Sequence, residues 1–242
     1  MKIPSEINGM LERSEEKLLE LSNEYTECVN DDKITEKLKN ITHEIIEKNR
    51  HILDKIMRII WNIYYLPSLS IIDRKKRHKI YFPIADSYSN FSWIMNKNKM
   101  SDLEKKNKSL YDYLLSLQPY THRRNKWLEQ LAKIAGEGKH EQFKEQKRED
   151  FQHYSVTTQD GGTRVSWAEP IVKFNTNHAK IKILNTPVDP FKKDLLKNPD
   201  LIIEKDTTKN IILDGINENV YIYCKILIVK NKVLVKKIFA LL

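Results

Sequence analysis

The spacing of the hydrophobic residues changes near residues 149–153, and this change restricts the fold more than any other feature of the 242-residue chain. Before it, apolar residues such as Ile7, Leu11 and Leu18 recur at helical spacing, which is typical of one face of a helix. After it, apolar and polar residues alternate, which is typical of half-buried strands. The sequence therefore predicts an α+β protein: an N-terminal and central helical bundle in residues 1–150 and a small antiparallel β-module in residues 151–242.

The first 65 residues are predicted to form an antiparallel helical hairpin. Residues 30–32, Asn-Asp-Asp, interrupt the apolar pattern and supply capping groups. Pro67 prevents the second helix from continuing. The apolar stripe of that helix is interrupted at residues 48–49, Lys-Asn, so its buried face is not a perfect hydrophobic seam.

Turn signals organise the predicted β-module. Residues 160–162, Asp-Gly-Gly, separate two short strand patterns at 154–158 and 163–167 and predict a hairpin. The clearest strand is expected at residues 220–229, where apolar side chains alternate. For the last segment, 233–242, both a strand and a short final helix fit the pattern.

The two cysteines and the apolar content predict a soluble protein of the cytoplasm. Cys28 and Cys224 form no CxxC pair, which argues against a disulfide framework or a structural zinc site and favours buried free thiols. Glutamates interrupt the first 22 residues, so no signal peptide is expected there. No stretch has the roughly 18 apolar residues of a membrane helix. We expect no membrane association, no metal and no cofactor.

The formal net charge of +9 is concentrated in the middle of the chain. A basic surface of this kind can hold a nucleic-acid backbone, because each neutralised phosphate releases counterions. The alternative is an ordinary solvated surface, which the excess of lysine over arginine favours, since nucleic-acid sites prefer the forked guanidinium. The candidate nucleic-acid-binding residues are Arg74, Lys75, Lys76, Arg77, Lys79, Arg123, Arg124 and Lys126.

Several classes of enzyme site are excluded by their missing motifs. The six glycines form neither a dinucleotide-binding GxGxxG loop nor a GxxxxGK[ST] phosphate loop. The chain also has no GxSxG nucleophile elbow and no HExxH zinc helix. The seven histidines are scattered and make no metal-ligand pattern.

Arg148 and His153, with four residues between them, resemble the Rx4-6H motif of the HEPN ribonucleases. The resemblance implies a helical bundle, usually a homodimer, in which the arginine and the histidine act on the RNA 2′-hydroxyl and phosphate. Histidine can move a proton near neutral pH, and arginine can stabilise charge that develops on phosphate. The alternative is that these residues belong to a polar connection between the two modules.

Four further segments resemble a family of uncharacterised prokaryotic proteins with a helical hairpin and a β-rich end. They are IIEKNRHILDKI at 45–56, IYFPI at 80–84, LQPY at 117–120 and NKWL at 125–128. A Lys-His pair, Lys139 and His140, matches the same proteins. Asn125, Lys139 and His140 could grip a phosphate or nucleotide. Alternatively, they could cap helix ends and fix the following loop by hydrogen bonds.

The expected function is that of a non-enzymatic binding protein that recognises RNA or a protein partner, in a stress or phage-defence setting implied by the HEPN resemblance. A metal-independent ribonuclease using Arg148 and His153 is one alternative. A structural interaction module with an exposed apolar patch on its β-module is another. Three tryptophans, Trp93, Trp127 and Trp167, are expected in the core.

Overall fold

The protein folds into two compact units in a computed structural model that describes residues 1–76, 78–137, 146–158, 164–170, 181–183, 186–188 and 201–242. A helical unit comprises Met1–Gln146 and Leu213–Leu242, and a β-unit comprises Lys147–Ile212. The α+β class is confirmed. The predicted division at residue 150 lies near the start of the β-unit, but the prediction that this module extends to residue 242 is wrong, because the last 30 residues belong to the helical unit.

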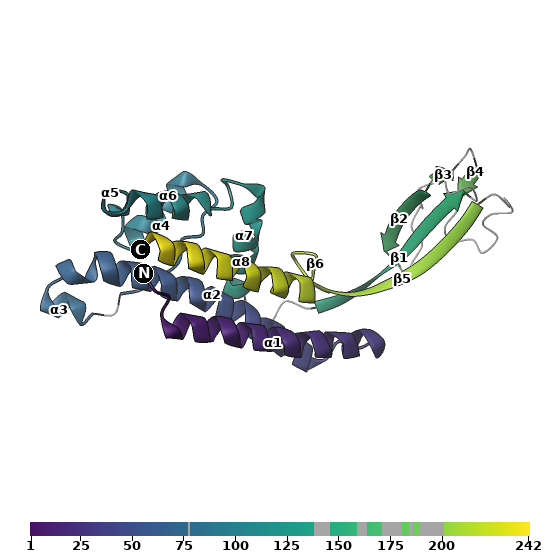
Figure 1. The fold of residues 1–242 in the computed structure, drawn as a ribbon, viewed down its shortest axis with the longest axis horizontal. Coiled ribbons are helices and arrows are strands. Elements are labelled where there is room, and N and C mark those ends of the chain that lie inside the picture. The colour runs from purple at the N-terminus through teal and green to yellow at the C-terminus, as the bar shows by residue number, and fades with distance from the viewer. Residues whose placement is uncertain (77, 138–145, 159–163, 171–180, 184–185, 189–200) are drawn as a thin grey trace. The chain divides into compact units, whose positions relative to one another are not determined.

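A long helical hairpin begins the helical unit, as predicted. Helix α1, Ser5–Asn30, packs on α2, Glu36–Tyr64 (Figure 1). The Thr35 hydroxyl caps α2 by accepting a hydrogen bond from the Leu38 amide at 3.0 Å, which satisfies one of the free amides of the first turn. Beyond α2, the chain forms the 3₁₀ turn η1, Leu66–Ser68, with Pro67 inside it, and the short helix α3, Ile71–Arg74.

The middle of the helical unit consists of short helices joined by tight turns. They are α4, Tyr88–Lys97; α5, Leu103–Lys106; α6, Lys108–Ser116; the 3₁₀ turn η2, Arg123–Asn125; and α7, Lys126–Glu137. Between α3 and α4, residues 78–85 form neither a helix nor a strand. Phe91 and Met95 of α4 are buried in the core, as the sequence predicted.

The final helix, α8, corrects the prediction for residues 220–229. This segment is not a strand, and residues 230–232 are not a turn, because Val220–Leu241 forms one helix. Its buried residues recur at three- and four-residue spacing and pack on α1 and α2. The short alternating pattern was compatible with a strand, but burial against the hairpin requires the helical period. Of the two alternatives for the last segment, the helix is confirmed.

Two asparagines meet in the core between α2 and α8. The Asn231 side chain donates to Asn49 Oδ1 at 2.7 Å and to the Asn49 carbonyl oxygen at 3.1 Å. The Asn49 amide group donates to the Ile45 carbonyl oxygen at 2.8 Å, which orients it within its own helix. Both residues are fully buried. Asn49, which interrupts the apolar stripe of α2, is therefore the hydrogen-bond partner of Asn231 in α8. This polar pair favours one register of the two helices.

The strands are β1, Gln146–Thr158; β2, Arg164–Pro170; β3, Ile181–Ile183; β4, Thr186–Val188; β5, Leu201–Leu213; and β6, Glu218–Asn219. The sheet order is β2-β1-β5-β6, with β3 and β4 paired separately. The predicted hairpin is confirmed, since β1 and β2 pair antiparallel with Tyr154 opposite Trp167. Its predicted turn at 160–162 lies outside the described residues.

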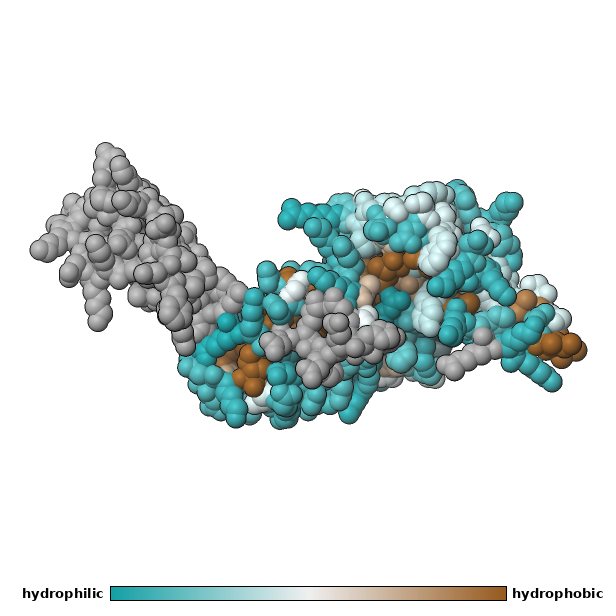
Figure 2. Space-filling model, turned by 180° about the vertical axis from the view of Figure 1, so that it is seen from behind, coloured by the Kyte–Doolittle hydropathy of each residue, from teal (hydrophilic) through white to brown (hydrophobic). Residues whose placement is uncertain are grey.

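The surface of the helical unit is mostly hydrophilic when seen from behind (Figure 2). Brown, hydrophobic surface is confined to small areas, one of them at the end that carries α3, where Ile71 and Ile72 are exposed. Within the ranges that the structure describes, no helix is long and apolar enough to cross a membrane.

Candidate functional site

The extended segment between α3 and α4, residues 79–86, is held by hydrogen bonds from its backbone to side chains. In a sheet, a neighbouring strand would make these hydrogen bonds. Asn98 is buried and bonds both polar groups of the Tyr81 backbone: its Oδ1 accepts from the amide at 3.3 Å, and its Nδ2 donates to the carbonyl oxygen at 2.7 Å. Asp54 Oδ1 accepts from the Phe82 amide at 2.8 Å. Arg50 donates to the Phe82 carbonyl oxygen at 3.3 Å and lies 3.1 Å from the Asp54 carboxylate.

Gln118 holds the other end of the extended segment. It is fully buried, and its Oε1 accepts from the Ala85 amide at 2.9 Å. Its Nε2 donates to the carbonyl oxygens of Pro83 at 3.2 Å and of Leu114 at 2.8 Å. A buried side chain with three good partners has little freedom to move, so this end of the segment is fixed against α6.

Asn125 fixes the turn that follows Gln118. Its Nδ2 donates to the Ser116 carbonyl oxygen at 2.8 Å, to the Gln118 carbonyl oxygen at 3.2 Å and to the Thr121 hydroxyl at 3.2 Å. This is the pattern of hydrogen bonds that the structural alternative for Asn125 expects. Lys139 and His140 lie outside the described residues. The four segments singled out in the sequence at 45–56, 80–84, 117–120 and 125–128 are thus linked by one chain of side-chain hydrogen bonds.

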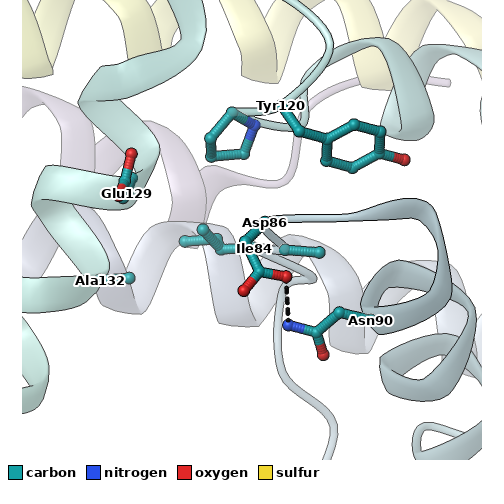
Figure 3. A pocket seen from close by; sticks show the side chains of 8 residues that line it. Ile84, Asp86, Asn90, Tyr120, Glu129 and Ala132 are labelled. Carbon is teal, nitrogen blue, oxygen red and sulfur yellow. Dashed lines mark hydrogen bonds between the residues drawn. The ribbon is translucent and has the colours of Figure 1, made fainter.

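A pocket of about 440 Å³ opens beside this network. Figure 3 shows Asp86 and Asn90 on one side of it, Glu129 and Ala132 of α7 on the other, and Tyr120 above them. The pocket is lined by Ile84, Ala85, Asp86, Asn90, Pro119, Tyr120, Glu129 and Ala132. Sequence reasoning missed Asp86 and Glu129 as candidates. The only signal was indirect: both follow closely on segments that were singled out.

The pocket is negatively charged. Asp86 accepts hydrogen bonds at 3.1 Å from the Asn90 amide group and from the Ser87 hydroxyl, and these bonds lower the pKa of its carboxyl group. Burial raises the pKa of Tyr120, which keeps its hydroxyl neutral. Lysine, arginine and histidine are absent from the lining residues, all of which the structure describes. A chain with a net charge of +9 thus carries an acidic pocket.

The first group of predicted nucleic-acid-binding residues lies around α3. The Arg74 guanidinium donates to the carbonyl oxygens of Leu69 and Pro67, and Lys76 pairs with Asp73 at 2.7 Å. Lys75 and Lys79 are exposed, and Arg77 lies outside the described residues. Arg74 and Lys76 therefore already have protein partners, which weakens them as phosphate ligands.

The second group lies at η2 and the start of α7. Arg123, Arg124 and Lys126 are exposed there. Lys230 of α8 donates to the Arg124 carbonyl oxygen at 2.7 Å, and its ammonium lies 5.8 Å from the centre of the Trp127 ring. Burial and the nearby Arg124 charge lower the pKa of Lys230. This basic group therefore borders α8.

Two of the three tryptophans can be compared with the prediction. Trp127 is buried, as expected. Trp93 is not in the core: 58% of it is exposed, and the Lys97 ammonium lies 4.8 Å from its ring centre. Trp93 falls outside the α4 positions that pack inward, Phe91 and Met95. The side chain of Trp167 lies outside what the structure describes.

Arg148 and His153 both lie on strand β1. Arg148 is half-buried and has an interaction partner, and the His153 backbone is paired with Ala168. The resemblance implied a helical setting for this pair, and strand β1 does not provide it. Positions five apart in a strand belong to opposite faces, so the strand alone does not bring the pair together.

An exposed aliphatic stripe runs along α8. Ile222, Ile226, Val229 and Val233 are 51%, 43%, 54% and 61% exposed and follow each other at spacings of four, three and four residues. At about 100° per residue, they lie within an arc of about 60°. Five lysines flank this arc: Lys225, Lys232 and Lys236 on one side and Lys230 and Lys237 on the other. The helix contains no acidic residue.

Comparison of the chain with protein-family models, with curated proteins and with solved structures gave no match. In the part of the chain that the structure describes, no group of three or more histidine, cysteine or acidic residues could hold a metal ion. The acidic pocket and the lysine-flanked stripe of α8 are therefore the candidate sites that the geometry provides.

Proposed function

We propose that the protein binds a partner protein by docking an acidic amphipathic helix along the aliphatic stripe of α8. One observation carries the proposal: four large aliphatic side chains of a single helix are exposed at heptad-like spacing. The opposite face of α8 is buried against α1 and α2, so the helix is apolar on both sides. A helix with apolar residues on two opposite faces normally has both faces covered.

The width of the stripe supports a helical partner. An arc of about 60° matches the narrow seam between two helices, whereas a helix that lies on a membrane presents an apolar face of roughly 100° or more. From Ile222 to Val233, the stripe is about 17 Å long at 1.5 Å per residue, or three turns. Three turns of a partner helix would place matching aliphatic residues against all four positions.

The lysines support an acidic partner. Charged residues beside the seam of two paired helices determine which partner binds, and the charged residues beside the stripe of α8 are all lysines. Two copies of α8 would oppose lysine with lysine, so this surface disfavours the homodimer expected from the HEPN resemblance. Lys232 already pairs with Glu15 of α1, which leaves Lys225, Lys236 and Lys237 as exposed lysines for a partner.

A designed peptide tests the proposal. The probe is a labelled 21-residue helix with leucine at the seam positions and glutamate beside them. We expect fluorescence anisotropy to show binding that weakens with salt, and Val229→Asp should reduce the affinity at least about tenfold, since it places a charge in the seam. Ile72→Asp is the matched control, an equally polar change at an exposed isoleucine of α3. Equal binding of a peptide with lysine in place of glutamate would refute the proposal.

A second candidate function is binding of single-stranded RNA, and exposed Trp93 favours it. An exposed ring with an ammonium above it can stack on a base, and nearby Lys97, with the exposed Lys75 and Lys79, can meet phosphates. Retention of a labelled 20-nucleotide oligouridine should fall severalfold in Trp93→Ala and remain unchanged in Ile222→Ala. The assay is run in EDTA, where cleavage that is lost in His153→Ala would instead support the ribonuclease alternative.

The setting we propose is the cytoplasm. Cys28 and Cys224 are both buried and free, which suits a reducing compartment. The stress or phage-defence role stays a prediction.

A further inference from the structure

We propose that the acidic pocket binds an α,ω-diamine, an organic dication in which an aliphatic chain joins two ammonium groups. The site is separate from the stripe of α8 and goes beyond the proposed docking of a partner. Its lining combines two carboxylates, four apolar residues, one aromatic ring and one amide. This is the chemistry of a charged ligand with an apolar body.

The charges favour a cation, and both carboxylate residues, Asp86 and Glu129, are exposed where a ligand can reach them. Asp86 is held ionised by the hydrogen bonds from Asn90 and Ser87, and Glu129 supplies a second carboxylate. Without a basic residue among the described lining residues, the charge of the lining is −2. Each carboxylate accepts hydrogen bonds only, and an ammonium group offers three donors.

The positions of the carboxylates favour two cationic centres over one. Asp86 precedes α4 and Glu129 belongs to α7, so they approach the pocket from different elements (Figure 3). A ligand with an ammonium group at each end can form an ion pair with both carboxylates, whereas a monoamine leaves one carboxylate without a cationic partner. The volume of about 440 Å³ is within the range of small-molecule sites.

The walls suit the aliphatic chain that joins the two centres. Ile84, Pro119 and Ala132 offer apolar surface, and the Tyr120 ring can additionally attract an ammonium group to its face. The main chain beside Ala85 and Pro119 is fixed by Gln118. The pocket is therefore formed before a ligand arrives, which avoids part of the entropy loss on binding.

Isothermal titration calorimetry with the series from 1,2-diaminoethane to 1,6-diaminohexane, in 150 mM salt, tests the proposal. We expect one chain length to bind best, at least about tenfold tighter than butylamine. Asp86→Asn and Glu129→Gln should each reduce the affinity for the best diamine to the affinity for butylamine. Asp112→Asn, the same loss of charge at an exposed residue of α6, should leave binding unchanged.

A second variant keeps the test independent of any effect of charge on folding. Ala132→Trp fills the pocket from α7, on a helix that remains free to form, and should abolish diamine binding while circular dichroism stays unchanged. The proposal would be refuted if the affinity did not depend on chain length, or if Glu129→Gln bound the diamine as tightly as wild type. Either result would mean that the diamine forms only non-specific ion pairs. The peptide experiment on α8 shares no residue with this one, so either proposal can fail alone.

Discussion

Single buried polar residues determine how the middle of this protein is built. The extended segment has backbone groups that no strand of the described structure satisfies, and Asn98, Asp54 and Gln118 take the place of a strand. The sequence marked two of these positions, Asp54 and Gln118, only as parts of longer segments, 45–56 and 117–120. Which backbone group each side chain would meet could not be predicted, because the partners lie 28 and 33 residues away in the chain.

Gln118→Met should strongly destabilise the protein. Methionine has nearly the same shape, but it leaves the Ala85 amide and the Pro83 carbonyl oxygen buried without a partner, and each such group costs about 1–3 kcal/mol. We expect a loss of about 3 kcal/mol in the free energy of unfolding, measured in urea. Gln130→Met, the same change at a half-buried position of α7, is the control. A loss as small as that of the control would mean that the hydrogen bonds contribute little.

Glu24 should make the stability of the α1–α2 hairpin depend on pH. Its buried carboxylate accepts from Lys37 at 2.6 Å and from the Thr35 hydroxyl at 2.5 Å, and these bonds lower its pKa in the folded state. A lowered pKa adds stability above the ordinary glutamate pKa, near 4.3, which is lost as the pH falls through the folded value. Unfolding measured from pH 7 to 3 should therefore show a steeper loss in wild type than in Glu24→Gln.

The matched control for that experiment is Glu16→Gln, an exposed glutamate on the same helix. Its curve should run parallel to that of wild type. If Glu24→Gln also runs parallel, the carboxylate has the same pKa in both states and the prediction is wrong.

At the scale of elements, the sequence pattern predicted the helices with one apolar face, α1 and α2, correctly. It gave a strand for the start of α8, a helix with two apolar faces. The α1–α2 hairpin was clear, because each helix presents a single stripe to the core. Helix α8 buries one face and exposes aliphatic residues on the other, and this hides the helical period. Its β-branched, alternating start at Val220 therefore looked like a strand. Packing against α2 decides between a strand and a helix for this segment, and the local sequence pattern does not encode that packing.

The contact between α2 and α8 should show strong energetic coupling at its asparagines. Asn231→Ala leaves the buried Asn49 Oδ1 without its donor, and Asn49→Ala removes one of the two acceptors of the buried Asn231 amide group, so each should lose about 2 kcal/mol. The double variant should lose at least about 1 kcal/mol less than the sum, since the second change removes a group that has already lost its partner. Asn231→Ala combined with Asn98→Ala, which share no partner, should be additive. Additivity in both pairs would contradict the coupling.

At the scale of the whole molecule, the β-unit is an insertion between two helices of one domain, α7 and α8. The predicted boundary at residue 150, where the hydrophobic period changes, differs by a few residues from the start of the β-unit at Lys147. Its end could not be placed, since the misread α8 made the β-pattern seem to continue. The candidate site was predicted only in part: the motif segments border it, but the charged residues inside it were not identified.

The helical unit should fold without its insertion. We expect a variant in which about twelve Gly and Ser residues replace Lys147–Ile212 to retain helical circular dichroism and a single cooperative unfolding transition, because α1, α2 and α8 bury one common core. The free energy of unfolding should stay within about 2 kcal/mol of the value for the full chain. Loss of the helical signal would show that the β-unit is needed to hold α8 in place.

The order of the chain also has a consequence for its synthesis. Helices α1 and α2 leave the ribosome well before α8, which is made only after the whole insertion has been translated. Until then, the side of the hairpin that receives α8, including Asn49, lacks the packing that α8 provides. We therefore expect the newly made hairpin to expose apolar surface of the kind that chaperones bind until α8 packs on it.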